Sequence, residues 1–444
     1  MELSAAGNAQ PGLPARKAAL QILSDVLRKK RPLDAAIADA LSKSNLAPRD
    51  AGFARLIAAT SLRRFGQLEA LIRVFVPKAP QPHKAGPTLE ILIAGACELL
   101  FLNVAPHAAV DAANRLAQTD SKSVHFKALI NAVLRRVTRE GAAVIASQDE
   151  AVLNTPDWLW PRWVEHYGQE TARAIATAHL QIPPLDLMLK AENNPSTDIE
   201  GMMSLAPGRL RLTQAGRIEE LSGYNEGEWW IQDFAATLPV RLFGDVAGKR
   251  VIDLCAAPGG KSAQLAAQGA FVTAVDVAFE RLATVRENLQ RLNLSAELVT
   301  GDARDWRPTE PAPFVLLDAP CMATGTIRRH PDLPWLKSAA DLQITETLQA
   351  ELLDAAAEMT APSGTLVYAV CSLEPEEGEQ QVDAFLRRNA DFARNPVTAT
   401  EVFDPAFVSA KGDLTTLPCF WAEKGGMDGF YAARLIRHSS RPSA

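Results

Sequence analysis

The sequence predicts a multidomain protein with an all-α N-terminal domain, a small α+β middle module and a C-terminal α/β domain built on a mostly parallel sheet. Residues 16–140 carry apolar side chains at helical spacing and show no strand-like alternation. From about residue 248, short continuous apolar runs alternate with helical segments, the pattern of buried parallel strands joined by helices. The 444 residues are also enough for about three domains.

The first domain is expected over 16–143, after a flexible N-terminus at 1–15. Its first helix places Ile22, Leu23, Val26 and Leu27 on one face. Further helical segments are predicted at about 51–76, 89–103, 107–118 and 123–138. The proline-rich stretch 77–87 predicts a loop between helices.

The middle module is expected over 150–235, with a linker helix opening near Pro156 and short strands from Leu185 onward. The α/β domain follows over 236–437, and 438–444 is expected to be a flexible tail. The strands of the α/β domain are predicted at 250–255, 271–276, 296–300, 314–318, 365–371 and 430–436. Helices are predicted between them at 261–268, 279–292, 338–360 and 376–389.

Charge is distributed unevenly along the chain. Residues 1–143 contain 20 Lys or Arg against 11 Asp or Glu, a balance of +9, whereas the whole chain has a net charge of −6. A basic first third, including the run Arg28, Lys29, Lys30 and Arg31, indicates a polyanionic partner, with nucleic acid as the leading candidate. Solvation of helix surfaces explains the same charge equally well at this point.

Several classes of protein are excluded by composition. The five cysteines are scattered and form no C-x-x-C pair, so neither a disulfide framework nor a zinc site is indicated. The most apolar stretch, 89–102, is too short to span a bilayer and contains two glutamates, and the first 14 residues lack the pattern of a signal peptide. We expect a cytoplasmic monomer that binds no metal and no membrane.

The chemically interesting residues all lie at the ends of predicted strands or shortly after them. They are Cys255, Ala256, Ala257, Pro258, Gly259, Gly260 and Lys261 after the first strand, Asp276 after the second, Asp302 after the third, Asp318 and Cys321 after the fourth, and Cys371 after the fifth. In an open α/β sheet, ligands bind at the carboxyl ends of the strands. The sequence therefore predicts one site at this edge.

The glycine turn and two of the acids suggest a nucleoside ligand. Gly259 and Gly260 let the backbone approach a ligand closely, Asp276 is placed to accept hydrogen bonds from ribose hydroxyls, and Asp302 falls where an adenine edge would lie. The G-x-G-x-x-G pattern of dinucleotide binders is absent. S-adenosylmethionine, a nucleoside cofactor, fits better than a dinucleotide.

Cys321 and Cys371 suggest the chemistry. Most free cysteines are small buried hydrophobic residues. Two cysteines at neighbouring strand ends that face an adenosine site favour covalent catalysis instead.

Four motifs together resemble the Sun family of RNA 5-methylcytosine methyltransferases, most closely its bacterial branch acting on 16S ribosomal RNA. They are WIQDFAA (230–236), LCAAPGGK (254–261), LLDAPCMATGTIRRHPDLPW (316–335) and YAVCSLEPEE (368–377). Residues 16–140 resemble, more weakly, the NusB-type helical domain of that branch. The resemblance implies a Rossmann-like class I methyltransferase domain, S-adenosylmethionine as cofactor and 16S ribosomal RNA as partner.

The resemblance also implies a role for each matching residue. The backbone of residues 255–261 with Asp276, Asp302 and Asp318 would bind S-adenosylmethionine. Cys371 would be the nucleophile that adds to carbon 6 of cytosine, and Cys321 would assist product release. Asp318 is also placed to hold the amino or N3 edge of the cytosine.

Further RNA contacts are expected from basic side chains. Arg328 and Arg329 offer paired guanidinium groups for phosphate, and the basic run Arg28, Lys29, Lys30 and Arg31 is also expected to bind RNA. The sequence departs from the family at Val370, where threonine is usual, at Met322, where serine is common, and at 190–193 (Lys-Ala-Glu-Asn), where an arginine-asparagine pair is usual. The last departure puts the RNA contacts of the middle module in doubt.

Three alternatives stay open from the sequence. The helical domain alone suggests a non-catalytic RNA-binding factor, and a similar sheet occurs in nicotinamide-dependent oxidoreductases. A DNA methyltransferase is the third alternative. It is disfavoured because in the DNA enzymes the nucleophile occupies the position of Cys321 rather than that of Cys371.

Overall fold

The computed structural model describes residues 12–78, 82–191, 201–213 and 217–439, which divide into two compact units. The helical unit comprises the chain up to Gln181 together with Ile327–Ser338, and the sheet unit comprises Ile182–Thr326 and the chain from Ala339 onward. Of the ends predicted to be flexible, 1–11 and 440–444 lie outside the described residues, and the first helix already begins at Leu13.

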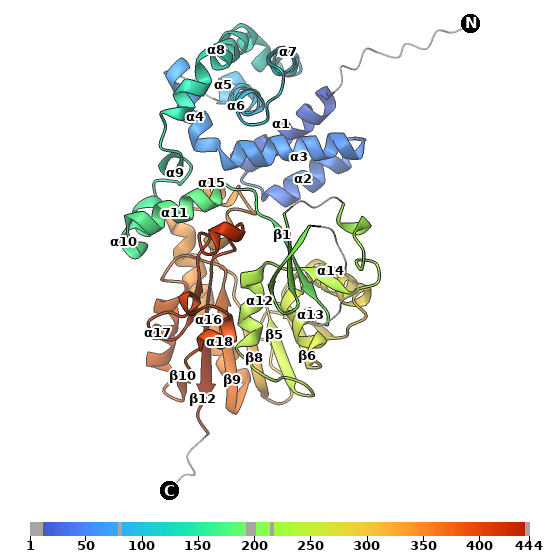
Figure 1. Ribbon diagram of the computed structural model, residues 1–444, viewed down its shortest axis with the longest axis vertical. Coiled ribbons are helices and arrows are strands. Elements are labelled where there is room, and N and C mark those ends of the chain that lie inside the picture. Colours follow the sequence, from blue (N-terminus) through green and yellow to red (C-terminus); the bar gives the residue numbers. More distant parts are fainter. Residues whose placement is uncertain (1–11, 79–81, 192–200, 214–216, 440–444) are drawn as a thin grey trace, which may run out of the picture. The chain divides into compact units, whose positions relative to one another are not determined.

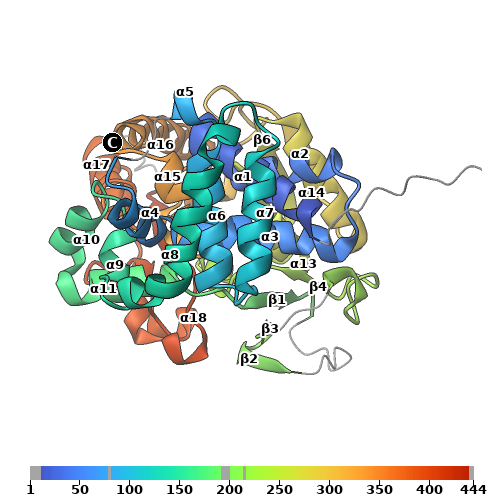
Figure 2. The same cartoon turned by 90° about the horizontal axis from the view of Figure 1, so that it is seen from above.

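Helices form the first unit, as the apolar periodicity predicts (Figure 1). They are α1 (Leu13–Lys29), α2 (Leu33–Ser42), α3 (Pro48–Arg63), α4 (Phe65–Phe75), α5 (Pro82–Ala85), α6 (Thr88–Leu100), α7 (Pro106–Ala117), α8 (Lys127–Ala146), α9 (Glu150–Leu153), α10 (Trp160–Tyr167), α11 (Gln169–His179) and α15 (Leu333–Leu336). Helices α6, α7 and α8 lie side by side (Figure 2) and bury a common apolar core that includes Ile93, Leu116 and Leu134.

Two local predictions in this unit are wrong in detail. The predicted helix over 51–76 is two helices, because α3 ends at Arg63 and α4 begins at Phe65. The predicted loop at 77–87 contains the four-residue helix α5, which starts at Pro82. Proline is well suited to a first helical turn because it has no N–H group that would need a partner there.

Residues 327–338 belong to the helical unit, although they follow Cys321 closely in the sequence. The Asp332 carboxylate accepts a hydrogen bond from the Leu33 backbone N–H at 2.8 Å. The Trp335 indole N–H donates to the Leu62 carbonyl at 2.9 Å, and the Trp335 ring packs edge-on against Phe65 with centroids 4.9 Å apart. The helical unit therefore holds a segment that the sequence analysis assigned to the α/β domain.

The predicted middle module is likewise divided. Its helical part, α9 to α11, belongs to the helical unit, and its strands belong to the sheet unit. The helix expected near Pro156 begins at Trp160. Helices α9 to α11 and residues 327–338 thus belong to the helical unit, in which Leu159 and Trp163 are buried.

A small antiparallel sheet opens the sheet unit, with strand order β2-β3-β1-β4. Its strands are β1 (Leu185–Leu189), β2 (Met202–Ala206), β3 (Arg209–Leu212) and β4 (Trp229–Ile231). A buried ion pair between Arg211 and Asp186, at 2.6 Å, joins β3 to β1. Asp186 also accepts a hydrogen bond from the Phe234 backbone N–H, so this carboxylate ties the small sheet to the start of helix α12 (Phe234–Arg241).

The large sheet has the order β10-β12-β9-β8-β5-β6-β7, with β11 paired to β12. Its strands are β5 (Arg250–Leu254), β6 (Phe271–Asp276), β7 (Glu297–Thr300), β8 (Ala312–Asp318), β9 (Thr360–Val370), β10 (Phe392–Arg394), β11 (Leu414–Thr416) and β12 (Phe430–Arg437). The strands from β9 to β7 are parallel, and β12 joins β9 antiparallel. The fold class is confirmed, but the sequence analysis missed β10 and β11, which are only three residues long.

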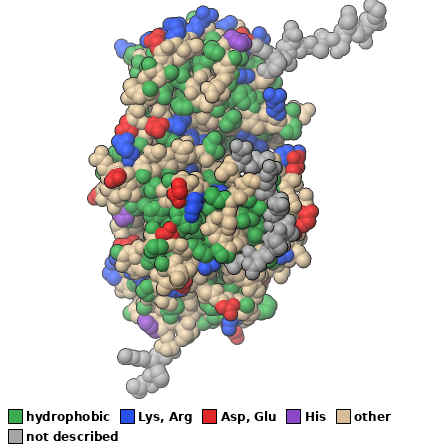
Figure 3. Space-filling view, in the orientation of Figure 1, with side chains coloured by type: hydrophobic (Ala, Val, Ile, Leu, Met, Phe, Trp, Pro, Cys, Tyr) green, Lys and Arg blue, Asp and Glu red, His purple; other side chains and the backbone are tan. Residues whose placement is uncertain are grey.

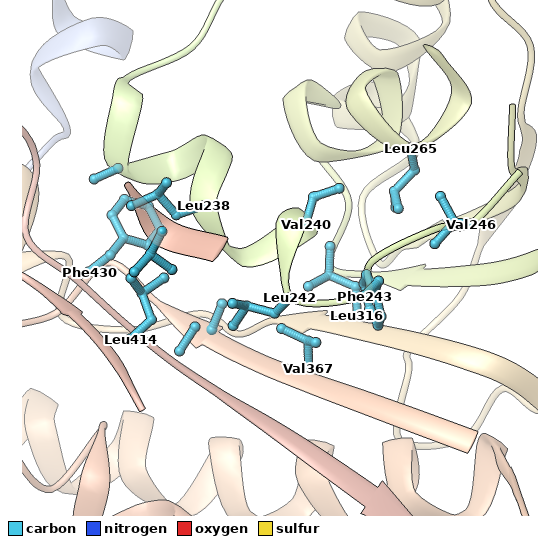
Figure 4. Packing of buried hydrophobic residues seen from close by; sticks show 14 of the residues in the cluster. Leu238, Val240, Leu242, Phe243, Val246, Leu265, Leu316, Val367, Leu414 and Phe430 are labelled. Atoms are coloured by element: carbon cyan, nitrogen blue, oxygen red, sulfur yellow. The ribbon is translucent and has the colours of Figure 1, made fainter. Parts of the chain in front are cut away.

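Helices cover both faces of this sheet. They are α12, α13 (Gly260–Ala267), α14 (Phe279–Arg291), α16 (Ala339–Met359), α17 (Glu379–Arg388) and the short α18 (Ala399–Val402). On one face Leu238 of α12 and Leu265 of α13 share a core with Leu316 and Val367 (Figure 4). Leu317, the next residue along β8, packs on the opposite face with residues of α16 and α17, as strand alternation requires.

The contacts of residues 327–338 lead to a stability prediction. Trp335→Phe keeps the aromatic contact with Phe65 but leaves the buried Leu62 carbonyl without its donor. We expect the free energy of unfolding to fall by about 1–3 kcal/mol, measured by urea unfolding followed by circular dichroism. Trp160→Phe is the control, because the Trp160 indole N–H donates to no residue in the described part of the chain. Equal losses in the two variants would contradict this role of the hydrogen bond.

Candidate active site

Four adjacent strands bring the predicted site residues to one edge of the large sheet. Cys255 follows the last residue of β5, Asp276 ends β6, Asp318 ends β8, and Cys371 follows the last residue of β9. Because β9, β8, β5 and β6 are consecutive parallel neighbours in the sheet, their carboxyl ends meet along a single edge.

The two cysteines lie in direct contact. Their sulfur atoms are 3.5 Å apart, although the residues are 50 positions apart in the chain. The hydrogen bond to Cys371, together with burial, raises the pKa of Cys321 well above its ordinary value. Cys321 is therefore a neutral thiol near neutral pH, able to donate its proton toward the sulfur of Cys371.

Further hydrogen bonds join the two loops that carry these cysteines. The Gly325 N–H donates to the Cys371 carbonyl at 3.0 Å, and the Leu373 N–H donates to the Thr324 hydroxyl at 2.9 Å. Gly325 packs so closely on the backbone of Gly429 that a Cβ atom there would lie 2.0 Å from the Gly429 carbonyl oxygen. Only glycine fits at 325, and the position of the loop is fixed accordingly.

Lys261 forms an ion pair with Asp318, with Nζ 2.7 Å from Oδ2. Burial disfavours the charge on Lys261, but the attraction of Asp318 outweighs burial and raises the pKa of the ammonium group. Lys261 is also near enough to Cys371 for a thiolate there to favour the lysine's charge. A cation, a carboxylate and two sulfurs thus converge at the ends of β5, β8 and β9.

The turn after β5 is shaped by its backbone. Cys255 has φ +60° and Gly259 has φ +100°, both in the left-handed region, and helix α13 begins at Gly260. A Cβ atom at Gly259 would lie 3.0 Å from the Val285 side chain. Burial raises the pKa of Cys255 to about 12, so this third cysteine is a neutral thiol near neutral pH.

Asp276 and Asp302 are the acids expected to hold a nucleoside. The Asp276 carboxylate is 1% exposed and accepts hydrogen bonds from the Ala257 and Ala278 N–H groups, both at 3.1 Å. Asp276 therefore fixes the turn after β5 to the end of β6. Asp302 pairs with Arg304 at 2.7 Å, and hydrogen bonds from this guanidinium lower the pKa of Asp302.

Two buried residues that the sequence analysis did not single out contact the segment around Cys321. Gln349 of α16 donates from Nε2 to the Pro320 carbonyl and to the Glu377 carboxylate, both at 2.9 Å. Glu377 in turn accepts the Met322 N–H at 3.0 and 3.1 Å. The signal for Glu377 in the sequence was its place in the run of acids shortly after Cys371.

Several residues expected to contact RNA are buried or form ion pairs within the protein. Arg328 is 2% exposed, and this burial argues against the predicted phosphate contact. In the basic run, Arg28 pairs with Glu90, Lys29 with Asp25, and Arg31 with both Asp25 and Asp39. On the face seen in Figure 3, acidic side chains likewise occur beside basic ones at several places.

The remaining predictions concern the middle module, metals and membranes. Lys190 donates to the Leu292 carbonyl at 2.6 Å, whereas Glu192 and Asn193 lie outside the described residues. Among the residues that the structure describes, no group of three His, Cys, Asp or Glu side chains is placed to hold a metal ion. No helix within the same ranges is long and apolar enough to cross a membrane.

Comparison with known proteins identifies two regions of the chain. Residues 242–436 match the family model described as 16S rRNA methyltransferase RsmB/F, and residues 13–139 match the NusB family. A ribosomal RNA small subunit methyltransferase B from Pasteurella multocida is 34% identical over 95% of this chain and 96% of its own length. One from Citrobacter koseri is 36% identical over 85% and 88%.

Solved structures show the same fold. The crystal structure of PH0851 covers 94% of this chain and 98% of its own, with a TM-score of 0.75 at 22% identity. A methyltransferase homologue from Pyrococcus horikoshii covers 62% of this chain and 93% of its own, with a TM-score of 0.52 at 25% identity. The full-length similarity to the curated relatives excludes the oxidoreductase and the non-catalytic factor considered above. The chain belongs to the 16S rRNA methyltransferase RsmB/F family, whose methyl donor is S-adenosylmethionine.

Proposed function

We propose that this protein transfers a methyl group from S-adenosylmethionine to carbon 5 of a specific cytidine in 16S ribosomal RNA, with Cys371 as covalent nucleophile and Cys321 acting in product release. The observation that carries the proposal is the 3.5 Å contact between these two sulfurs beside the Lys261–Asp318 ion pair. The family relationship supports the same reaction and the same substrate.

The residues at the sheet edge fit the methyl donor. Gly259 has a left-handed conformation just before α13, and acidic side chains lie at the ends of β6 and β8 (Asp276, Asp318) and shortly after β7 (Asp302). This set offers carboxylate acceptors for the hydroxyl and amino groups of a nucleoside, and a helix N-terminus beside them. When bound, S-adenosylmethionine supplies an electrophilic methyl group on a sulfonium ion.

Cys371 makes the cytosine reactive. Carbon 5 of cytosine is a poor nucleophile, and addition of the Cys371 thiolate to carbon 6 converts the ring to an enamine whose carbon 5 is able to accept a methyl group. A cysteine thiol of ordinary pKa is only a few per cent thiolate at neutral pH, so activation is needed. The Cys321 S–H and the Lys261 ammonium are the groups that stabilise a thiolate at this position.

Product release restores the aromaticity of the cytosine ring. The proton on carbon 5 must leave, and the bond between carbon 6 and the Cys371 sulfur must break with its electron pair returning to sulfur. Cys321 contacts the Cys371 sulfur and is therefore the side chain that we propose takes that proton, as a thiolate that has first lost its own proton to water. Asp318, with a side chain 31% exposed, is placed to bind the amino or N3 edge of an extruded cytosine.

The NusB-like helical unit is proposed to bind the RNA. Lys29 and Lys30 are exposed, and Arg28, Arg31 and the half-buried Arg329 are further candidates for phosphate contacts. Arg28, Lys29 and Arg31 form ion pairs with Glu90, Asp25 and Asp39. To bind phosphate, each basic group would have to leave its carboxylate or contact both anions. Ribosomal RNA as substrate implies that the enzyme acts in the cytoplasm, and the proposed mechanism requires only one copy of the chain.

The cofactor site leads to a second prediction. Asp276→Ala should weaken S-adenosylmethionine binding about 10- to 150-fold, because the cofactor loses a charged acceptor and the turn after β5 loses its anchor. Isothermal titration calorimetry measures this change. Asp305→Ala, which removes an exposed carboxylate from the loop after β7, should bind as the wild type does. Unchanged affinity in Asp276→Ala would remove this residue from the site.

The two cysteines should behave differently when they are replaced. Cys371→Ala should abolish methyl transfer and form no covalent RNA complex, because no thiolate adds to carbon 6. Cys321→Ala should still add and methylate, then stall with RNA attached through Cys371. A denaturing gel with labelled 16S rRNA and S-adenosylmethionine shows the complex as a slow band, which should vanish in the double variant.

Two results would overturn this assignment. A trapped band in Cys371→Ala would reverse the roles and give the arrangement of the DNA enzymes. Full turnover in both single variants would exclude covalent catalysis by this pair, leaving the cysteines a packing role only.

A further inference from the structure

The backbone on both sides of Cys321 is held by one pair of buried side chains. Gln349 Nε2 donates to the carbonyl of Pro320, the residue before Cys321, at 2.9 Å. Glu377 accepts the N–H of Met322, the residue after it, at 3.0 and 3.1 Å. Gln349 and Glu377 are themselves joined at 2.9 Å. We call these two residues the Cys321 clamp.

The clamp draws on three elements of the fold. Gln349 comes from α16, Glu377 from the loop after β9, and the residues that they hold from the loop after β8. The Glu377 backbone is anchored in turn, since its carbonyl accepts the Tyr368 hydroxyl at 2.7 Å. The clamp therefore fixes the Cys321 segment relative to the strand that carries Cys371.

Both members of the clamp are fully buried, each with 0% exposure. Burial raises the pKa of Glu377, while hydrogen bonds from Ser372, Thr345, Met322 and Gln349 oppose that shift. A carboxylate is costly to bury unless its oxygens are well supplied with donors. The number of donors here indicates that the Glu377 carboxylate is held in one orientation.

Two other hydrogen bonds hold the loop of Cys371. They run from Gly325 N–H to the Cys371 carbonyl and from Leu373 N–H to Thr324, and neither involves Gln349 or Glu377. One contact of the clamp does reach the residue after Cys371, the Ser372 hydrogen bond to Glu377, and Gln349→Ala leaves it in place. Weakening the clamp should consequently free Cys321 more than Cys371.

We propose that Glu377, bridged by Gln349, is a positioning residue that holds Cys321 in place for product release. This inference rests on the proposed function, in which Cys321 acts after methyl transfer. Loss of the clamp leaves the nucleophile and cofactor residues in place and misplaces the release group. Displacement of a catalytic group by about 1 Å lowers a rate up to about 100-fold. Release should therefore slow about 10- to 100-fold, with addition and methylation largely retained.

The test compares Glu377→Ala, Gln349→Ala and Glu377→Gln in the full-length protein with unmethylated 16S rRNA. The first two should accumulate the covalent complex seen with Cys321→Ala, while a single round of methylation proceeds near the wild-type rate. Glu377→Gln keeps an oxygen that accepts the Met322 N–H, and should restore much of the release rate. Glu379→Ala is the control, because Glu379 lies nearby on α17 and pairs only with Lys411 among the residues described.

Several outcomes would overturn the clamp. Release at the wild-type rate in both alanine variants would do so, as would an equal loss of methylation and complex formation, which marks a general structural defect. If Glu377→Ala does not fold, Gln349→Ala and Glu377→Gln decide the question alone. The proposed function fails separately, through absence of methylation by the wild type or absence of a trapped complex in Cys321→Ala.

Discussion

The parallel pairing of β8 with β9 is the constraint on which the site depends. In this register Asp318 lies opposite Ala369, so the loops that leave the two strands start side by side. Residues 50 positions apart are thereby brought into sulfur–sulfur contact at 3.5 Å. A slip of one residue would turn Asp318 to the opposite face of the sheet and separate the pair.

The two cysteines are chemically identical side chains in different electrostatic surroundings. The contact with Cys371, burial, and the nearby charge of Glu377 all raise the pKa of Cys321. Cys371 instead has the Lys261 ammonium as a neighbour. Two thiolates in contact would repel each other, so the proposed mechanism uses one thiolate at a time, first at Cys371 beside the Lys261 ammonium. Under the proposed mechanism, once Cys371 is bound to carbon 6 its sulfur no longer carries a charge that repels a thiolate at Cys321, so Cys321 loses its proton to water and then takes the proton of carbon 5.

The sequence predicted those features that follow from local patterns. Continuous apolar runs located the central strands within a few residues, and the position of each reactive residue just after a strand located the common edge. Other features depend on contacts distant in the sequence. Burial of Arg328, inclusion of 327–338 in the helical unit, and the Gln349–Glu377 bridge result from packing, which periodicity does not reveal. The sequence shows the basic run at 28–31, but it does not show that Asp25, Asp39 and Glu90 form ion pairs with it.

The central claim is that the methyl group replaces the hydrogen on carbon 5 of cytosine. The most direct measurement uses 16S rRNA transcribed with cytidine tritiated at carbon 5, incubated with the purified protein and S-adenosylmethionine. The account predicts that one tritium is released to water for each methyl group incorporated. Methyl incorporation with the tritium retained would place the methyl group on another atom and contradict the role of both cysteines.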